Sequence, residues 1–365
     1  GMAWVLETEG LVDHSFLATY TVGYEIFREY LLGNTDGIAK TPEWAAALSE
    51  IPADVITSLA RSLVQGKSII NTSWSLQRAE YGEQAPWMSL TLAAMVGQIG
   101  TAGGGFGFGY SSMYSIGEDA HLLGAPLFNQ LHNRVKDFIP VARISDLLLN
   151  PGKPYQYNGQ DRTYPDIRLV WWAGGNPFHH HQDLGRLQQA LGRPDTIIVN
   201  DPYWTPMARH ADIVLPSTVS MEREDIGGAN NDSLIVAMKA AVPVNAEARD
   251  DYDIYAAIAE RMGLGEKFTE GKTSNEWVRD IYESWRQRIV TKWADAPPYD
   301  QLREDGFVEL PYLAKPCVML EEFRANPTGH PLGTPSGKIE IFSRTIESFG
   351  YEDCRGHARW YEPDE

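Results

Sequence analysis

Residues 167–183 read IRLVWWAGGNPFHHHQD, and this stretch determines the fold expected for the second half of the chain. The apolar run at 167–172 is typical of a buried strand, and Gly174-Gly175-Asn176-Pro177 is typical of a turn. The elements that follow alternate as helix, strand, helix and strand, at 182–191, 196–200, 205–209 and 212–216. Short apolar strands separated by helices indicate an α/β fold with a mainly parallel, doubly wound sheet.

The first half of the chain carries the same kinds of element. A short apolar strand is expected at 68–71, and apolar spacing predicts helices at 16–32, from Thr41-Pro42 onward, at 52–64 and at 85–99. Later elements are two helices and a strand, at 252–263, 274–291 and 338–342. Asn158-Gly159 is typical of a turn. The change of pattern places a domain boundary within 115–150.

The charge balance excludes several classes of partner. The 365 residues include 31 Lys and Arg against 49 Asp and Glu, a net charge of −18. A polyanion is bound mainly by basic side chains, so no nucleic acid is expected as a partner. No apolar run reaches about 18 residues, so no membrane insertion is expected. Cys317 and Cys354 form no CxxC pair, which argues against an iron–sulfur cluster or a structural zinc and leaves one disulfide open.

The turn at 174–177 is a candidate ligand site. Ligands of parallel sheets bind at the carboxyl ends of strands, and two glycines let the backbone approach a ligand closely. The helix that follows can offer free N–H groups to a phosphate. The pattern is not GxGxxG, and a tight connection without any ligand is the alternative. His179, His180 and His181 are adjacent, so they point in different directions and favour polar contacts to a cofactor over a metal site.

Two later segments extend this candidate site. Asp201 follows the second strand, 26 residues after Gly175, where an acidic residue can bind a ribose or a base, although a helix cap is the alternative. Arg209, His210 and Asp212 are expected to crowd the mouth of the third strand, with an ordinary surface loop as the alternative.

The first half contains a comparable strand end. Polar side chains follow the strand at 68–71, namely Trp74, Gln77, Arg78, Glu83 and Gln84. Arg78 is a candidate phosphate or ring partner because its planar guanidinium donates in pairs. The glycines at 103–105 are expected either to form a turn or to let a cofactor lie flat on the backbone. No GxSxG or HExxH is present, so the chain lacks the usual residues of a hydrolase.

Several segments, in order along nearly the whole chain, are similar to the molybdopterin oxidoreductases. They include WSLQRAEYGEQ at 74–84, FIPVARISDLLLNPGKP at 138–154, WWAGGNPFHHHQD at 171–183, NDPYWTPMARHADIVLP at 200–216 and GHPLGTPSGKIEIFS at 329–343. The branch that the chain resembles most contains the dimethyl sulfoxide, trimethylamine N-oxide and biotin sulfoxide reductases.

This resemblance implies one molybdenum held between two molybdopterin guanine dinucleotides. It also implies two pseudo-symmetric, Rossmann-like domains, each binding one guanine dinucleotide tail. We expect residues 1–130 to form part of the first domain, 131–345 the second, and 346–365 a C-terminal extension. The cofactor-binding residues expected from motif and resemblance together are Trp74, Ser75, Gln77, Arg78, Gly82, Glu83, Gln84, Gly104, Gly105, Gly174, Gly175, Asn176, Pro177, His179, His180, Asp201, Tyr203, Thr205, Arg209, His210 and Asp212.

The resemblance further implies oxygen-atom transfer from a small S-oxide or N-oxide, with electrons from a donor protein or an NAD(P)H system. The serine that ligates molybdenum in this branch, and the domain that closes over the pterins, have no counterpart here. We therefore expect a partial chain with no catalytic residue and no metal ligand, inactive alone and without the complete cofactor. The alternatives are a formate dehydrogenase or nitrate reductase type, or a non-catalytic nucleotide-binding module. A periplasmic and a cytoplasmic location both stay open.

Overall fold

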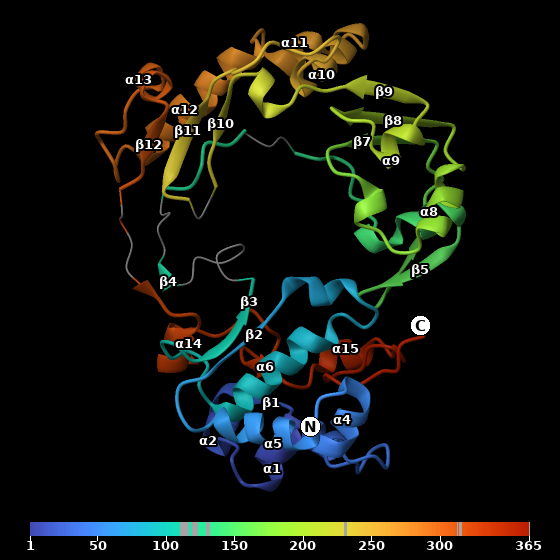
Figure 1. Ribbon diagram of the computed structural model, residues 1–365, viewed down its shortest axis with the longest axis vertical. Helices are drawn as coiled ribbons and strands as arrows, with labels where there is room; N and C mark the ends of the chain where they lie inside the picture. Colours follow the sequence, from blue (N-terminus) through green and yellow to red (C-terminus); the bar gives the residue numbers. More distant parts are fainter. Residues whose placement is uncertain are drawn as a thin grey trace. The chain divides into compact units, whose positions relative to one another are not determined.

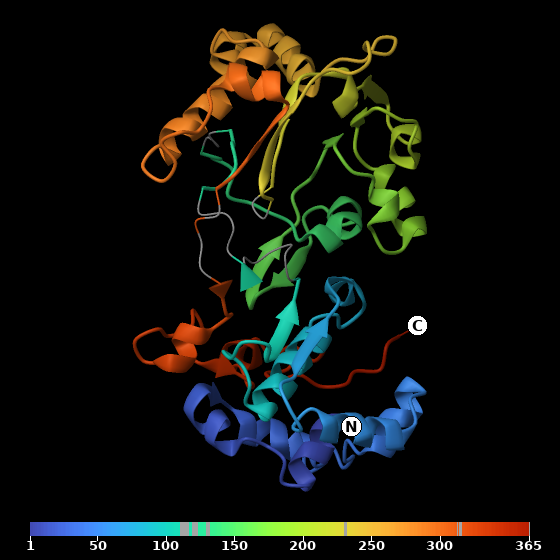
Figure 2. The same cartoon turned by 60° about the vertical axis from the view of Figure 1, so that its left-hand side comes forward.

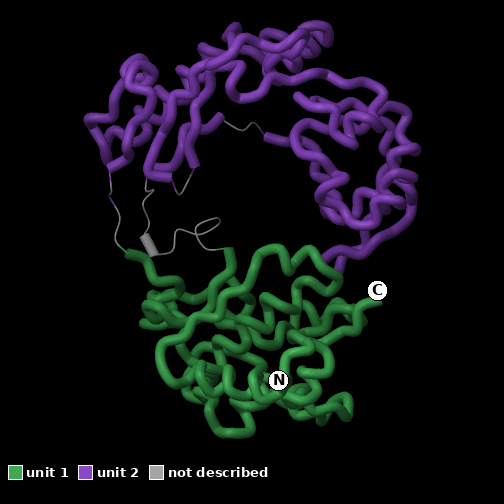
Figure 3. The backbone as a smooth tube through the Cα atoms, viewed as in Figure 1, with its two compact units in different colours: residues 1–119, 315–365 green, residues 120–314 purple. Residues whose placement is uncertain are grey.

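The computed structural model describes residues 1–109, 117–118, 123–128, 132–229, 232–311, 313 and 316–364 (Figure 1; Figure 2 gives a second view). The chain forms two compact units, unit 1 with residues 1–119 and 315–365, and unit 2 with residues 120–314 (Figure 3). The α/β class expected from the sequence is confirmed. Pseudo-symmetry between two domains stays a prediction, and the expected boundary at 130 lies outside the described residues.

Unit 1 combines helices with short parallel strand pairs. β1 (Thr21–Val22) pairs in parallel with β14 (Ile339–Glu340), and β2 (Ile69–Thr72) pairs in parallel with β3 (Gly105–Phe108). β4 (Gly117–Glu118) and β13 (Pro316–Cys317) form an antiparallel pair. The helices are α1 (Met2–Thr8), α2 (His14–Tyr20), α3 (Tyr24–Leu31), α4 (Pro42–Ser49), α5 (Ala53–Ser62), α6 (Gln84–Val96), α14 (Glu321–Ala325) and α15 (Arg344–Ser348).

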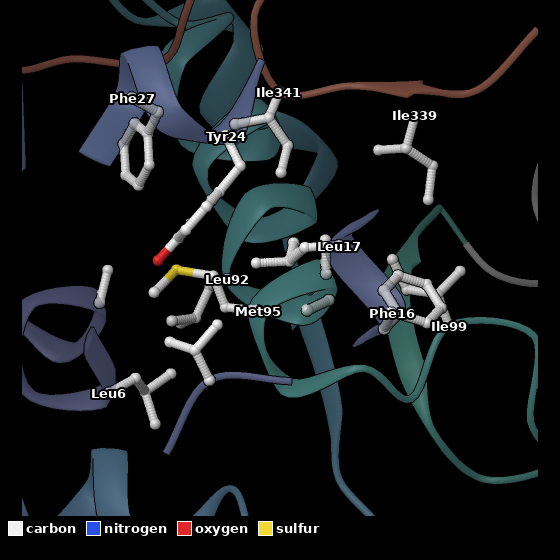
Figure 4. Packing of buried hydrophobic residues seen from close by; sticks show 14 of the residues in the cluster. Leu6, Phe16, Leu17, Tyr24, Phe27, Leu92, Met95, Ile99, Ile339 and Ile341 are labelled. Atoms are coloured by element: carbon white, nitrogen blue, oxygen red, sulfur yellow. The ribbon is translucent and has the colours of Figure 1, made fainter. Parts of the chain in front are cut away.

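The core of unit 1 surrounds the C-terminal half of α6 (Figure 4). This helix is apolar on every side, and four consecutive residues, Leu92 to Met95, are buried. A helix of this composition must be enclosed, because an amphipathic helix would bury only one stripe. Residues from distant parts of the chain enclose it, including Leu6, Phe16, Tyr24 and Ile341.

The return of the chain into this core divides the molecule differently from the expected domains. Residues from 316 onward belong to unit 1, whereas the sequence placed residues up to 345 in the second domain. The physical reason is the pairing of β14 with β1, together with the burial of Ile339 and Ile341 in the core of unit 1. The pairing of two strands that lie some 300 residues apart in the chain cannot be predicted from local sequence patterns.

Unit 2 contains a parallel sheet with strand order β7-β8-β9, formed by Leu169–Ala173, Thr196–Asp201 and Ile213–Pro216. An antiparallel sheet holds β10 (Asp225–Gly227), β11 (Leu234–Met238) and β12 (Phe307–Glu309), and β5 (Pro154–Tyr157) forms a hairpin with β6 (Gln160–Thr163) around the expected Asn158-Gly159 turn. The helices are α7 (Ile144–Leu149), α8 (Leu184–Leu191), α9 (Pro206–Arg209), α10 (Asp251–Arg261), α11 (Gly265–Thr269), α12 (Ser274–Ile289) and α13 (Tyr299–Asp305).

Most of the elements expected from the sequence are present within two or three residues, but the helix expected at 16–32 is wrong. It is interrupted by β1, so that α2 and α3 are separate helices. Gly23 has a φ of +81°, and a Cβ there would lie 2.3 Å from Phe342 Cβ. Two β-branched residues can extend into a strand, and the glycine permits the close approach of the returning chain. Cys317 and Cys354 are both free.

Candidate cofactor-binding site

The carboxyl edge of the β7-β8-β9 sheet brings the second-half motifs together. Ala173 pairs with Asn200, and Asp201 pairs with Pro216, so the residues after each strand emerge at one edge. This is the edge where open parallel sheets bind ligands. The expected convergence of the GGNP turn and Asp201 therefore follows from the register.

The GGNP turn exposes the backbone of two glycines and contains one side-chain hydrogen-bond donor without a partner among the described residues. Gly174 and Gly175 are exposed with φ of +77° and +74°, and nothing lies within 4 Å of a Cβ added at either position. Asn176 is only 6% exposed. Its Oδ1 accepts the Phe178 N–H at 3.2 Å, whereas its buried Nδ2 has no acceptor among the described residues. Because a buried donor without a partner is costly, an oxygen of a bound ligand would complete this turn.

The expected helix after the turn is delayed. A short 3₁₀ turn at Pro177–His179 comes first, and α8 begins at Leu184 behind an Asp183 cap that accepts the Arg186 N–H at 3.0 Å. The backbone that faces a ligand here is thus the glycine pair, rather than the start of α8.

The histidines near this edge differ in environment. His179 and His180 are exposed, while the His210 ring stacks on Phe178 with centroids 4.7 Å apart. His210 Nδ1 lies 2.7 Å from Pro206 O, which orients the ring. Within the part of the chain that the structure describes, no three His, Cys, Asp or Glu side chains are grouped to hold a metal ion.

Asp201 organises the loop that follows β8. One carboxylate oxygen accepts the Tyr203 N–H at 2.9 Å, and the other accepts the Thr205 hydroxyl at 2.8 Å. Thr205 in turn caps α9 through the Ala208 N–H. Each carboxylate oxygen retains a lone pair, so Asp201 can order this loop and still accept a hydrogen bond from a ligand. The Tyr203 side chain is left exposed.

Asp212 lies away from this edge, and its expected place at the mouth of the third strand is wrong. Its Oδ2 accepts the Ile197 N–H at 2.8 Å, next to the first residue of β8. That is the amino edge of the sheet. α9, which ends at Arg209, returns the chain along the sheet because a parallel neighbour has to begin at the same edge as β8. Asp212 therefore satisfies the sheet and is not available to a ligand at the carboxyl edge.

Sequence reasoning missed a partly buried polar network at the carboxyl edge. Asn200 accepts the Trp171 indole N–H at 2.9 Å and donates to Asp251 Oδ1 at 2.8 Å. Ser217 also donates to Asp251, at 3.2 Å, and Thr218 donates to Asp250 at 2.7 Å. The strand-end rule that identified Asp201 would also have found Ser217-Thr218, which follow β9. Asp250 and Asp251 carry no such signal, because they begin α10 about 50 residues beyond Asn200.

In unit 1, the first-half motif follows β2 as expected. Residues Trp74–Arg78 form a 3₁₀ helix directly after the strand, and residues 73–80 are exposed. The Trp74 ring meets Phe108, at the end of β3, edge-on with centroids 6.0 Å apart. The Ser75 hydroxyl lies 2.8 Å from that of Ser73. Gln77 and Arg78 are thus open to a ligand at the carboxyl end of the β2-β3 pair.

Gly82, Glu83 and Gln84 lie farther along, where the chain enters α6. Gly82 and Gln84 line a cavity of about 390 Å³ within unit 1. Gln84 Nε2 donates to Glu83 Oε1 at 2.8 Å, and Gln84 Oε1 accepts the Arg359 N–H at 3.0 Å. Burial, and the Glu83 carboxylate beside it, raise the pKa of the Cys354 thiol to about 11. The thiol therefore stays protonated at neutral pH.

Gly104 and Gly105 are placed apart from the other first-half residues. Gly105 pairs with Ile69 at the amino end of β3, whereas Trp74 follows the carboxyl end of β2. A Cβ on Gly104 would lie 2.6 Å from Thr101 Oγ1, and Gly105 has a φ of +101°. These glycines are required by the tight turn into β3, which confirms the turn interpretation, and contact of these two residues with a cofactor stays a prediction.

Comparisons with known proteins identify the family of the chain. Residues 8–261 match the family model for molybdopterin oxidoreductase. The chain belongs to the molybdopterin oxidoreductase family. It is 45% identical over its whole length to a biotin sulfoxide reductase of Cereibacter sphaeroides, and 46% identical to a dimethyl sulfoxide/trimethylamine N-oxide reductase of that organism. A trimethylamine-N-oxide reductase of Haemophilus influenzae is 45% identical.

The chain spans about half the length of the relatives it matches, 49% and 46% for the two Cereibacter proteins. Among solved structures, acetylene hydratase from Pelobacter acetylenicus matches the whole chain with a TM-score of 0.58 at 17% sequence identity, and 49% of that protein is covered. This likeness shows that the two proteins share a fold.

Family membership implies a molybdopterin cofactor, and the residues of unit 2 fit such a group. The unsatisfied Asn176 Nδ2 is a donor for phosphate or ribose oxygens, and the exposed glycine backbone leaves room beside it. In unit 1, Arg78 is an exposed cation at a strand end. Both donor sets suit the anionic, oxygen-rich part of a cofactor of this kind.

Proposed function

We propose that this chain binds the guanine dinucleotide tails of two molybdopterin guanine dinucleotides, within an oxidoreductase that reduces S-oxides or N-oxides. The proposal is supported by the whole-chain identity of about 45% to reductases named for biotin sulfoxide, dimethyl sulfoxide and trimethylamine N-oxide.

The observation that carries the proposal is the carboxyl edge of β7-β8-β9. In the proposed complex the Gly174-Gly175 backbone lies against the diphosphate, Asn176 Nδ2 donates to one of its oxygens, and Asp201 accepts from the ribose or the base. When bound, the cofactor supplies the oxygen-atom transfer and redox chemistry of its molybdenum. The residues of this chain bind and orient the nucleotide end, so that the reactive end is held in place.

The proposed reaction converts the oxide, two electrons and two protons into the reduced compound and water. We propose that the electrons come from a donor protein or an NAD(P)H system. We propose that the chain alone does not turn over an oxide, since the strand-end residues of unit 2 proposed above would bind only the nucleotide end of the cofactor.

Binding of guanosine diphosphate to the chain tests the nucleotide site by calorimetry. We expect saturable binding that is stronger than for adenosine diphosphate, and about tenfold weaker in Asn176→Ala, as for the loss of one hydrogen bond to a charged group. Asn245→Ala, at an exposed position, is the matched control and should bind normally. Absence of guanosine diphosphate binding, or equal affinity of Asn176→Ala and the unchanged chain, would contradict the nucleotide site.

Turnover tests the reaction class. A molybdopterin-loaded reductase that includes this chain should reduce dimethyl sulfoxide or trimethylamine N-oxide with a reduced viologen dye as the electron source. Oxidation of formate, or reduction of nitrate, without any reduction of either oxide would refute the proposed substrate class. The nucleotide site would be unaffected by that result.

A further inference from the structure

The end of the chain runs across the loop that carries Glu83 and Gln84. We name residues 354–364 the strap, which ends at the C label in Figures 1 and 2, and residues 79–84 the GEQ loop. The Arg359 N–H donates to Gln84 Oε1 at 3.0 Å, and the Asp364 N–H donates to Glu80 Oε2 at 3.0 Å. Between these two hydrogen bonds the rings of Tyr361 and Tyr81 stack, 4.9 Å apart and 29° from parallel.

The GEQ loop holds a backbone conformation that is costly on its own. Tyr81 has a φ of +51°, in the left-handed region, which is unfavourable for a residue other than glycine. Gly82 is equally constrained, because a Cβ there would lie 2.6 Å from the carbonyl carbon of Gln77. Such conformations persist only where the surroundings impose them, and they concentrate at functional sites. The strap supplies contacts on both sides of Tyr81.

The strap itself is firmly attached to the core of unit 1. His357 and Ala358 are buried, and His357 forms an isolated bridge with Phe342. The Trp360 N–H donates to the Tyr30 hydroxyl at 2.9 Å. The Arg355 N–H donates to the Tyr361 hydroxyl at 2.9 Å, so the ring that stacks on Tyr81 is also held from its other end.

The contacts of the strap also orient the polar side chains of the GEQ loop. Because Gln84 Oε1 is taken by the Arg359 N–H, the amide nitrogen of Gln84 is turned toward Glu83 Oε1, at 2.8 Å. The strap therefore determines both the backbone of the GEQ loop and which way the Gln84 amide faces. Neither Tyr361 nor Arg359 belongs to a motif that the sequence singled out.

We propose that Tyr361, together with the backbone amide of Arg359, is a positioning element for the GEQ loop. It holds Glu83 and Gln84 in one orientation before the molybdopterin cofactor binds. This inference rests on the proposed function for the identity of the ligand. The ordering of the loop itself does not depend on the ligand.

Hydrogen–deuterium exchange of the chain without cofactor tests the ordering. The amides of Gly82 and Gln84 donate to Ala79 O and Tyr81 O at 3.1 and 3.0 Å. Tyr361→Ala should speed exchange at these amides about three- to tenfold, the loss expected for one stacked aromatic pair, while Tyr361→Phe keeps the stack and should stay within about twofold. Tyr361→Leu serves if the alanine variant does not fold.

Trp360→Ala is the matched control, because it removes the neighbouring ring, whose indole N–H donates to Glu362 within the strap, and keeps the Trp360 N–H. It should leave exchange of the GEQ loop unchanged. Unchanged exchange in Tyr361→Ala and Tyr361→Leu, or an equal rise in Trp360→Ala, would overturn the proposal.

The loaded reductase separates this inference from the proposed function. The release of pterin is measured by the fluorescence of the released pterin after oxidation. It should be about three- to tenfold faster in Tyr361→Ala and normal in Tyr361→Phe and Trp360→Ala. Faster loop exchange with unchanged pterin release overturns the positioning role. A loaded protein that holds no pterin at all contradicts the proposed function instead, and the exchange experiment then still decides whether the strap orders the loop.

Discussion

At the scale of single residues, the same side chain type serves opposite purposes at the two edges of one sheet. Asp201 follows β8 at the carboxyl edge and orders the loop beside the GGNP turn. Asp212 precedes β9 at the amino edge and accepts the Ile197 N–H. Both are acidic residues next to an apolar strand, so sequence pattern treats them alike. The direction of the strand separates a candidate ligand residue from a structural one.

Replacing Asp212 should therefore affect stability and not binding. Asp212→Ala leaves the buried Ile197 N–H without its acceptor, which we expect to lower the free energy of unfolding by about 1–3 kcal/mol. Urea denaturation measures this change, and Asp212→Asn, which retains an acceptor oxygen, should recover most of it. Affinity for guanosine diphosphate should be unchanged in both variants. If Asp212→Ala folds but binds guanosine diphosphate more weakly, Asp212 contributes to the ligand site and this prediction is wrong.

At the scale of elements, glycine decides where helices end and distant strands meet. The apolar spacing at 16–32 is compatible with one helix, yet the chain breaks into α2, β1 and α3. The break lets β1 pair with β14, which arrives from more than 300 residues away. Gly23 is needed there because its backbone has a positive φ and Phe342 packs directly against it.

Gly23→Ala should be strongly destabilising. A left-handed alanine costs about 1–2 kcal/mol and the contact with Phe342 adds about 1–3 kcal/mol, so we expect a loss of roughly 2–5 kcal/mol in the free energy of unfolding. Gly10→Ala is a matched control, because Gly10 also has a positive φ of +69° but has nothing within 4 Å of the added Cβ. Gly10→Ala should lower the free energy of unfolding only by the cost of the left-handed backbone, about 1–2 kcal/mol. Equal losses in the two variants, measured by urea denaturation, would show that the packing against Phe342 is unimportant.

At the scale of the whole molecule, the described residues of unit 2 form two core clusters, whereas those of unit 1 form one, which is complete only when the chain returns from unit 2. The strap brings His357 into contact with the rings of Phe27, Tyr30 and Phe342. Burial, with a smaller contribution from the Arg359 cation, lowers the pKa of His357 below its ordinary value of 6.5. The folded unit therefore prefers the neutral imidazole.

This preference makes the stability of unit 1 depend on pH. Since the folded pKa is the lower one, the unfolded chain binds more protons as the pH falls below about 6.5, and stability is lost in that direction; above 6.5 the contribution is fully present. Urea denaturation at pH 7.5 and 5.5 should show a larger loss in the unchanged chain than in His357→Phe. A difference of the same size in both proteins would exclude His357 as the source.

No helix among the residues described is long and apolar enough to cross a bilayer. The assignment to the molybdopterin oxidoreductases rests on the chain as a whole, since the sequence similarity extends over its full length.

The sequence by itself determined the α/β class, the strands at 68–71, 196–200 and 212–216, the glycine turn and the family. These follow from local properties, because apolar spacing, β-branched runs and glycine pairs act over a few residues. Only the tertiary structure decided which strand edge each side chain reaches, and it separated Asp212, Gly104 and Gly105 from the other candidates. It alone showed the Asn200–Asp251 network and the strap over the GEQ loop. These contacts join residues from about 50 to nearly 300 positions apart, and no local preference of the chain encodes such a distance.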